Sequence, residues 1–458
     1  MSTNSKARRY GLLAAVGLGI LLNPLNTTMI TVAFSRLEAD FHIGYDVISW
    51  LIATYYVASA IAQPVMGKLS DLIGQKRVFL FGLGLVTISS LLAPWSPSIG
   101  WLIAFRVIQA IGTSSLFPSG MGLIRSSITE KQAGALGVLT IFTSTSAAFG
   151  PVIGGFLIHY GDWPAIFWVN FPVIAISFLL SVKFLPKDGP RKRLGSGVLD
   201  IAGIVLFTAL IVVWLLFFLS FGSGLKVWIL LLTGIVLGFL FYKYELTRTQ
   251  PFIDISFLKK NLHVCLVYLQ YLAVNIVFYA ILFSIPSYLK QVQHLDDRIV
   301  GVTMLALSGF AVAVTPLVSR LADRSGIKMP LIIGSSFLLA GVLLILLFPS
   351  PSTGHMIAVL SVFGVGIGFQ NLSLQAAIFS LVPKEETGIA SGLFMTSRFI
   401  GTILSSSILG AFFSGGITAA GVQDMAMICA LIVLALLALS IGMPGGSKVA
   451  QTSKSLDK

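Results

Sequence analysis

The chain has 458 residues, of which 56% are hydrophobic and only 10% are charged, whereas a soluble domain carries about 25% charged residues. Its mean hydropathy of +0.94 leaves too few polar groups to cover a water-soluble surface, which excludes an ordinary soluble enzyme. The net charge of +13 would suit a nucleic-acid partner, but the basic residues lie in small groups between long apolar runs. We therefore expect an all-α integral membrane protein in contact with the lipid bilayer, and no nucleic-acid partner.

Fourteen apolar runs have the length of a membrane-spanning helix, which needs about 20 mostly apolar residues. In chain order, these predicted spans cover residues 11–34, 47–66, 78–94, 101–124, 134–158, 164–182, 198–219, 226–242, 262–289, 299–319, 330–348, 356–382, 388–413 and 424–443. The first run follows Lys6, Arg8 and Arg9. It is too long for the apolar segment of a signal peptide, so we interpret it as a retained span.

Positive charges are distributed unevenly between the two sides of the predicted membrane. With the N-terminus inside, most of the 30 Lys and Arg residues lie in the inner segments. The outer segments hold only Arg36, Lys226, Lys290 and Arg298. Because cytoplasmic loops are enriched in Lys and Arg, we expect a multi-pass protein of the plasma membrane with both termini in the cytoplasm, and we expect it to be bacterial and monomeric.

Two short segments resemble each other and indicate an internal repeat. GKLSDLIGQK (67–76) follows the second predicted span, and SRLADRSGIK (319–328) follows the tenth, 252 residues further along the chain. Both lie in short inner loops, so the two halves of the chain share one orientation, as in transporters built from parallel repeats. The eight spans from one segment to the other leave room for two inserted helices between six-helix halves.

The repeat predicts a division of the chain into two bundles with an inserted hairpin. We assign residues 1–197 to an N-terminal six-helix bundle, 198–243 to the transmembrane hairpin and 244–261 to a cytoplasmic linker. A C-terminal six-helix bundle covers 262–443, and 444–458 form a cytoplasmic tail.

The segment from Gly67 to Arg77 resembles the loop motif GxLaDrxGrkr of the major facilitator superfamily, and the chain is similar to its fourteen-span drug:H+ antiporter branch. The resemblance implies that family's fold and a loop that latches one conformation and releases another. Its glycines permit a tight turn, and an aspartate can accept hydrogen bonds from a helix N-terminus. The conformational-switch residues implied here are Gly67, Asp71, Gly74, Lys76, Arg77, Asp323 and Gly326.

Two further spans resemble motifs of this family. Leu102, Arg106, Gln109 and Gly112 are similar to lxxxRxxqGxg, whose Arg is implicated in proton transfer; a purely structural Arg remains the alternative. An Arg at a helix centre costs about 2.5–3.5 kcal/mol, so Arg106 should face the bundle interior. The next span resembles the antiporter motif gx8gx3GPx2GG, which is associated with exporters. Its residues here are Gly137, Ser146, Gly150, Pro151, Gly154 and Gly155.

The first span departs from the branch's pattern LDxTivnvALP, because Asn26 stands where an acid is usual. None of the 17 acidic residues lies in the middle of a predicted span. A proton-driven carrier needs a group whose protonation alternates, and Asn cannot titrate. Arg106, Asp71 and Asp200 are the candidates for proton coupling. Either Asp71 or Asp200 couples transport to protons, or the carrier does not use protons in the family's manner.

Polar residues on several predicted spans indicate a substrate path, although packing is the alternative for most single members. The candidate residues are Asn23, Asn26, Thr27, Gln109, Tyr271, Asn275, Tyr279, Gln370, Asn371 and Arg398. Arg106 and Arg398 lie within spans without a buried acid, so we expect neutral, zwitterionic or anionic amphiphiles to be preferred over simple cations.

These features predict a secondary transporter that exports drugs or amphiphilic small molecules, in exchange for protons, and so contributes to antibiotic resistance. A dedicated carrier for a single metabolite, working inward or as a uniporter, is the alternative. The sequence has no GxxxxGK[ST], no HExxH and no Cys/His cluster, so we expect no enzyme, metal or cofactor.

Overall fold

The structure, a computed structural model, describes residues 3–43, 45–128, 132–189, 199–220, 225–348, 352–413 and 417–443. All regular elements within these ranges are helices. Twelve of the described helices are long and apolar enough to cross a membrane, or thirteen if the bent pair Gln132–Ala147 and Phe149–Gly161 forms one span. The predicted span 47–66 lies in a further helix, α3 (Tyr45–Ile73), which is not among these. The predicted total of fourteen membrane spans therefore stays a prediction.

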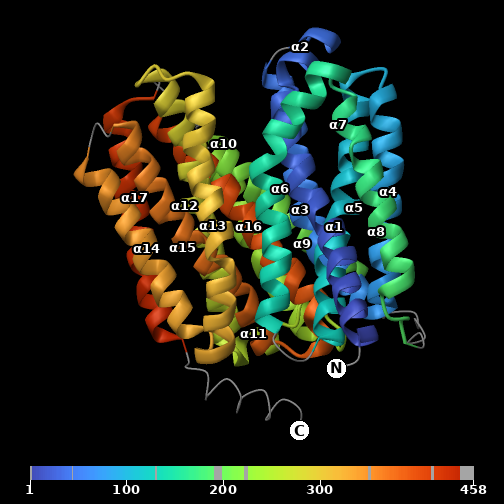
Figure 1. Cartoon of the computed structure of the whole chain (residues 1–458). Coiled ribbons are helices and arrows are strands. Elements are labelled where there is room, and N and C mark those ends of the chain that lie inside the picture. Colours follow the sequence, from blue (N-terminus) through green and yellow to red (C-terminus); the bar gives the residue numbers. More distant parts are fainter. Residues whose placement is uncertain are drawn as a thin grey trace. The chain divides into compact units, whose positions relative to one another are not determined.

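The chain divides into two compact units, and the first comprises Met1–Val198 together with Pro383–Thr396. Its helices are α1 (Thr3–Val32), α2 (Phe34–Phe41), α3 (Tyr45–Ile73), α4 (Gln75–Leu92), η1 (Ala93–Trp95), α5 (Ile99–Ser127), α6 (Gln132–Gly161), α7 (Ala165–Trp168), α8 (Asn170–Phe184), η2 (Lys384–Glu386) and the start of α16 (Thr387–Phe412). α1 packs against α5, α6 and α8, and α5 packs against α3 and α4 (Figure 1). α1 and α5 therefore form the centre of this unit.

The second unit comprises Leu199–Val382 and Ser397–Lys458. Its helices are α9 (Ile201–Leu219), α10 (Leu225–Thr247), α11 (Ile255–Lys260), α12 (Leu262–Gln291), α13 (Asp297–Ser325), α14 (Lys328–Leu347), α15 (Thr353–Leu381), α17 (Ala419–Gly442) and the remainder of α16. α15 packs against α13 and α14, and α17 packs against α14 and α12. α9 and α10 pack against each other in the region predicted as the inserted hairpin. The predicted domain boundaries stay a prediction.

Several long helices contain a proline, which would break a helix in water. The residues are Pro24, Pro64, Pro118, Pro151, Pro286 and Pro316. Membrane helices tolerate proline because neighbouring hydroxyl groups bond to the carbonyls it leaves free. In α1, the hydroxyls of Thr27 and Thr28 donate to the carbonyl of Pro24 itself, at 2.9 and 2.8 Å, whereas the carbonyl that the proline leaves without its helical donor is that of Ile20.

The two related segments form the same kind of helix junction. Gly74 separates α3 from α4 with φ of 116°, and Gly326 separates α13 from α14 with φ of 76°. Both values lie in the region that only glycine adopts without strain. Both copies of the repeated segment therefore place a glycine with positive φ between two helices.

Candidate functional site

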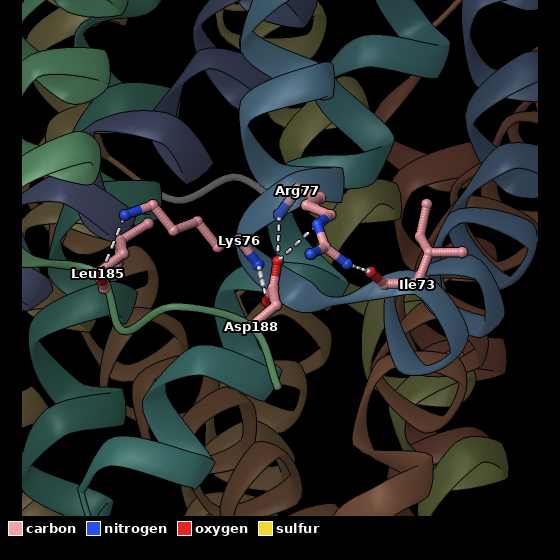
Figure 2. Close-up of polar contacts among 5 residues, drawn as sticks. All are labelled: Ile73, Lys76, Arg77, Leu185 and Asp188. Atoms are coloured by element: carbon pink, nitrogen blue, oxygen red, sulfur yellow. Dashed lines mark hydrogen bonds and ion pairs between the residues drawn. The ribbon is translucent and has the colours of Figure 1, made fainter. Parts of the chain in front are cut away.

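The turn between α3 and α4 is held by an acidic residue from the segment after α8. Asp188 accepts hydrogen bonds from the backbone N–H groups of Lys76 and Arg77, at 3.0 Å each (Figure 2). Its carboxylate also lies 3.8 Å from the Arg77 guanidinium. A Cβ atom on Gly74 would clash with the Asp188 carboxyl group. Glycine is thus needed at position 74 both for its backbone angle and for this close approach.

Lys76 also holds this turn, through contacts with the end of α8. Its ammonium group donates to the carbonyls of Val182 and Leu185, at 3.2 and 3.1 Å, where α8 ends (Figure 2 draws the Leu185 contact). A cation at a helix C-terminus satisfies carbonyls that have no partner within the helix. The basic end of the loop motif therefore ties α4 to α8 within the first unit.

Asp71, on the last turn of α3, caps the N-terminus of α16. Its two carboxylate oxygens accept the backbone N–H groups of Gly388 and Ile389, at 2.9 Å each. A Cβ atom on Gly67 would clash with the Gly388 carbonyl, so the two backbones lie in direct contact. The loop motif therefore supplies both the glycine and the acid for one contact with residues 383–396.

Burial raises the pKa of Asp71 from 3.8 to about 7, although the two backbone N–H groups act in the opposite direction. An ordinary aspartate is fully ionised at neutral pH. The pKa of Asp71 therefore lies near neutral pH.

Arg125 supports the same region. Its guanidinium donates to the Pro383 carbonyl at 3.1 Å and to the Thr387 hydroxyl at 2.8 Å. Arg125 follows the predicted span 101–124, but α5 extends past it, so Arg125 lies on the last turn of this helix and is buried. Asp323, the repeat counterpart of Asp71, is exposed and accepts no hydrogen bond from the described residues. The repeat thus preserves the turn without preserving the cap.

Arg106 lies on α5 in the interior of the first unit and is 1% exposed. One terminal nitrogen, Nη1, donates to the Asn26 carbonyl at 3.2 Å and to Gln109 Oε1 at 2.6 Å. The guanidinium carbon also lies 4.3 Å from the centre of the Tyr55 ring, a cation–π contact. The interior position predicted for Arg106 is therefore the observed one.

Buried amides hold Arg106 in place. Asn26 and Asn170 exchange two hydrogen bonds, at 3.0 and 2.9 Å, and Gln109 donates to Asn26 Oδ1 at 3.1 Å. Ser90 accepts from Asn170 at 3.1 Å. Asn26, which replaces the usual acid, is thus the centre of a neutral network. Asn170 and Ser90 were not predicted, because single polar residues in apolar runs carry no distinctive spacing.

The other first-span candidates divide into two roles. Asn23 donates to the hydroxyls of Tyr55 and Thr113, at 3.3 and 3.2 Å, and so joins α1 to α3 and α5. Thr27 donates only to carbonyls of its own helix among the described contacts. Asn23 is therefore part of the polar interior, and Thr27 serves the helix backbone.

The antiporter motif on α6 packs against α1. Ser146 donates to the Leu21 carbonyl at 2.9 Å, and a Cβ atom on Gly150 would clash with the Thr28 hydroxyl. A Cβ on Gly154 would lie 3.1 Å from the Met29 Cα atom. Gly137 is buried, Gly155 lies beside Val32, and Pro151 follows the 43° bend between the two parts of α6. Small residues let these helices approach closely.

In the second unit, Arg398 on α16 donates to the Tyr279 hydroxyl through Nε and Nη2, at 3.2 and 2.9 Å. Tyr271, Asn275 and Tyr279 share the buried side of α12, and Asn275 donates to the Tyr271 carbonyl at 2.7 Å. The structure thus brings together the predicted residues of α12 and α16. Gln370 instead connects α15 to α14 through the Leu331 carbonyl and the Ser335 hydroxyl. Asn371, next to Gln370, is half-buried.

Asp200 caps α9 by accepting the N–H of Gly203 at 2.9 Å, and the Tyr244 hydroxyl donates to it at 2.9 Å. Glu245, which the sequence placed in a linker, is 2% exposed and accepts the N–H of Ile253. A Cβ atom on Gly203 would lie 2.5 Å from Asp200 Oδ2 and 2.6 Å from Glu245 Oε1. The two carboxylates therefore converge at the start of the α9–α10 hairpin, which the sequence did not predict.

Comparison with known proteins shows the family. A model of the Major Facilitator Superfamily matches residues 16–406. The uncharacterized MFS-type transporter YwoD of Bacillus subtilis is 44% identical over 93% of this chain and 94% of its own length. The riboflavin transporter RibZ of Clostridioides difficile is 27% identical over 90% of each chain. The multidrug resistance protein Stp of Mycobacterium tuberculosis is 26% identical over 89% of this chain and 76% of its own.

The fold is also that of solved structures. The human organic anion transporter MFSD10 (TETRAN) has a TM-score of 0.71 with this chain, at 15% identity, over 94% of this chain and 99% of its own. At this identity the similarity shows the fold alone.

Proposed function

The chain belongs to the Major Facilitator Superfamily of membrane transporters, and we propose that it exports drugs or amphiphilic small molecules across the plasma membrane by alternating access. The polar interior around Arg106 carries this proposal, because buried charged and amide groups are costly inside a membrane bundle and mark substrate paths. The α6 motif from Gly137 to Gly155 and the relative named as a multidrug resistance protein support the outward direction.

The proposed arrangement is that of the fourteen-span antiporter branch. In the order of the sequence, the α9–α10 hairpin comes between two six-helix bundles; both termini lie in the cytoplasm, and the monomer is the working unit. The segment from Gly67 to Arg77, which is the end of α3, Gly74 and the start of α4, then lies at the cytoplasmic face. Its contact through Asp71 with residues 388 and 389 forms in one conformation and breaks in the other.

Proton exchange is the proposed driving force, with Asp71 as the coupling group. Its pKa of about 7 allows protonation to change near neutral pH, whereas the amide of Asn26 cannot titrate. One proton moving across 100 mV carries about 2.3 kcal/mol, which corresponds to roughly fiftyfold accumulation of substrate. Asp200 is the second acidic candidate, and Arg106 would act by positioning rather than by losing its own proton.

The test is export from cells with and without the protein, using matched anionic, neutral and cationic dyes. We expect lower accumulation of anionic and neutral dyes when the protein is present. Inverted vesicles with an imposed pH gradient then test coupling, with the gradient collapsed by an ionophore as the control. Equal dye levels in both strains would refute export, and dye flux indifferent to the gradient would refute proton exchange.

A dedicated carrier for one metabolite is the second candidate. The neutral side chain of Asn26 favours it, as does the similarity to a protein named as a riboflavin transporter. In that case a single compound, with riboflavin as the first probe, would accumulate differently in the two strains while all dyes remained unchanged.

A further inference from the structure

Arg106 carries two buried donor groups that nothing in the described chain accepts. Its Nη1 nitrogen is bonded, but Nε and Nη2 have no hydrogen-bond partner. The side chain is 1% exposed, so solvent does not reach these N–H groups either. Buried polar groups are normally bonded, and buried charges are normally paired. The two vacant donors therefore require an explanation beyond packing.

The vacant donors form one edge of the guanidinium plane. Nε and Nη2 point in the same direction with the fixed spacing that fits the two oxygens of a carboxylate. In the second unit, the same edge of Arg398 is occupied, because both of its nitrogens donate to the Tyr279 hydroxyl. The Nε/Nη2 edge of Arg398 therefore has a hydrogen-bond acceptor, whereas the same edge of Arg106 has none among the described residues.

No counter-charge is supplied to Arg106 from within the part of the chain that the structure describes. Its bonded partners are the Asn26 carbonyl and the neutral amide of Gln109, and the ring of Tyr55 covers the guanidinium. Tyr55 and Tyr56 are the titratable groups facing it. An arginine is always protonated in proteins. Among the described residues, the guanidinium of Arg106 therefore carries a positive charge and is surrounded by neutral groups.

The rest of the guanidinium is held rigidly. Gln109 and the Asn26 carbonyl fix Nη1, and the Asn26–Asn170 amide pair fixes Asn26 itself. A preorganised donor pair loses little freedom on binding, which increases affinity and specificity. We propose that the Nε/Nη2 edge of Arg106 is the subsite for a carboxylate group of the transported compound, whose charge replaces the acid missing at position 26.

This inference rests on the proposed transport function and names the substrate class of the same interior. Because Arg106 is closed to solvent in this conformation, the compound reaches it when the packing of Tyr55 over the guanidinium opens. The carboxylate forms two parallel hydrogen bonds to Nε and Nη2. A neutral analogue of the same shape cannot provide the counter-charge.

Binding of naphthoate and of its neutral amide, naphthamide, to the purified full chain tests the subsite through the thermal stabilisation that each compound produces. We expect half-saturation by naphthoate at a concentration about tenfold lower than by naphthamide, as expected for about 1.4 kcal/mol from a charged bidentate contact. In Gln109→Glu, a carboxylate of the same size already faces Nη1, so the preference for naphthoate should fall to about twofold or less. Arg106→Lys, which keeps the charge and loses the planar edge, should lose most of the preference too.

Equal stabilisation by the two compounds, no stabilisation by naphthoate, or an unchanged preference in folded Gln109→Glu would each overturn the subsite. If Arg106→Lys does not fold, Gln109→Glu alone decides. A chloride titration tests whether this edge binds an inorganic ion rather than a carboxylate. If chloride stabilises the protein at least as much as naphthoate does, the edge is assigned to an inorganic ion and the proposal is refuted. Failure of all dye export with intact naphthoate preference would refute the proposed function and leave the binding site.

Discussion

The contact between Asp71 and the start of α16 should depend on pH in a way that identifies the titrating group. The contact buries a carboxyl group whose pKa is about 7 when bound and 3.8 when free in solvent. The bound state therefore holds its proton more tightly than the released state. Lowering the pH from 7 towards 4 favours the bound state about tenfold per pH unit, and above pH 7 both states are ionised and the dependence disappears.

The total effect is large. The rise from 3.8 to about 7 corresponds to about 4 kcal/mol. The release equilibrium should therefore change about a thousandfold between pH 8 and pH 4. Hydrogen exchange of the amides of Gly388 and Ile389, which donate to Asp71, reports release directly once the intrinsic exchange rate has been subtracted.

Asp71→Asn is the decisive variant, because an amide keeps the shape and cannot titrate. We expect protection of these amides in the wild type to decrease by about one logarithmic unit per pH unit between pH 5 and pH 7. The same profile in Asp71→Asn should be flat. Asp323→Asn, at the matching place in the second repeat, is the control and should behave as the wild type. A flat wild-type profile, or an equal slope in Asp71→Asn, would refute the role assigned to this carboxyl group.

Three further predictions concern packing and capping. A Cβ atom on Gly392 would clash with the Gln63 carbonyl, whereas a Cβ atom on Gly410 of the same helix would meet nothing within 4 Å. Gly392→Ala should therefore lower the thermal unfolding midpoint, and Gly410→Ala should leave it unchanged or raise it. Asp188→Ala should lower the free energy of unfolding, measured with denaturant, by about 0.5–2 kcal/mol through loss of the α4 cap. Arg77→Ala should lower it less, because Arg77, the ion-pair partner of Asp188, is 43% exposed. An equal cost for the two variants would contradict capping as the cause. Tyr279→Phe removes the acceptor of the Arg398 edge and should cost about 1–3 kcal/mol, with Tyr288→Phe, at another buried tyrosine of the same helix, as the control.

Local features of the sequence predicted the turns and the buried arginine well. Gly74 and Gly326, predicted to permit a tight turn, lie at helix junctions with positive φ. Gly67, to which the same prediction applied, lies inside α3, so the predicted loop 67–77 is wrong except at Gly74. Arg106 was placed inside because an arginine within an apolar run is too costly to face lipid. Both inferences depend on the residue and its own helix, so one sequence was sufficient.

The partners of these residues could not be predicted, because they come from distant parts of the chain. Asp188 caps a helix that begins more than a hundred residues earlier, and Arg125 bonds to Thr387, which lies 262 residues further along the chain. No periodicity links such positions. Glu245 belongs to the predicted linker 244–261, but α10 extends to Thr247 and Glu245 is buried. The number of spans was uncertain for the same reason, since the edges of a helix depend on its caps and neighbours.

The substitution at position 26 connects the two proposals about transport. An aspartate there would lie within the network that binds Arg106, so it would neutralise the guanidinium and titrate in the same place. Asparagine does neither, so neutralising Arg106 and carrying the proton become tasks for two different groups. The proton then needs a group elsewhere, and Asp71 is an acid whose pKa is raised to about 7. The charge of Arg106 needs a partner that arrives with the substrate. The two proposals make independent predictions. Asp71→Asn should abolish the response of transport to a pH gradient while preserving the preference for naphthoate. Gln109→Glu should lower that preference to about twofold or less while keeping the part of the pH response that depends on Asp71. If one variant abolished both properties, the proton and the substrate would share a single site, and the separation inferred from Asn26 would be wrong.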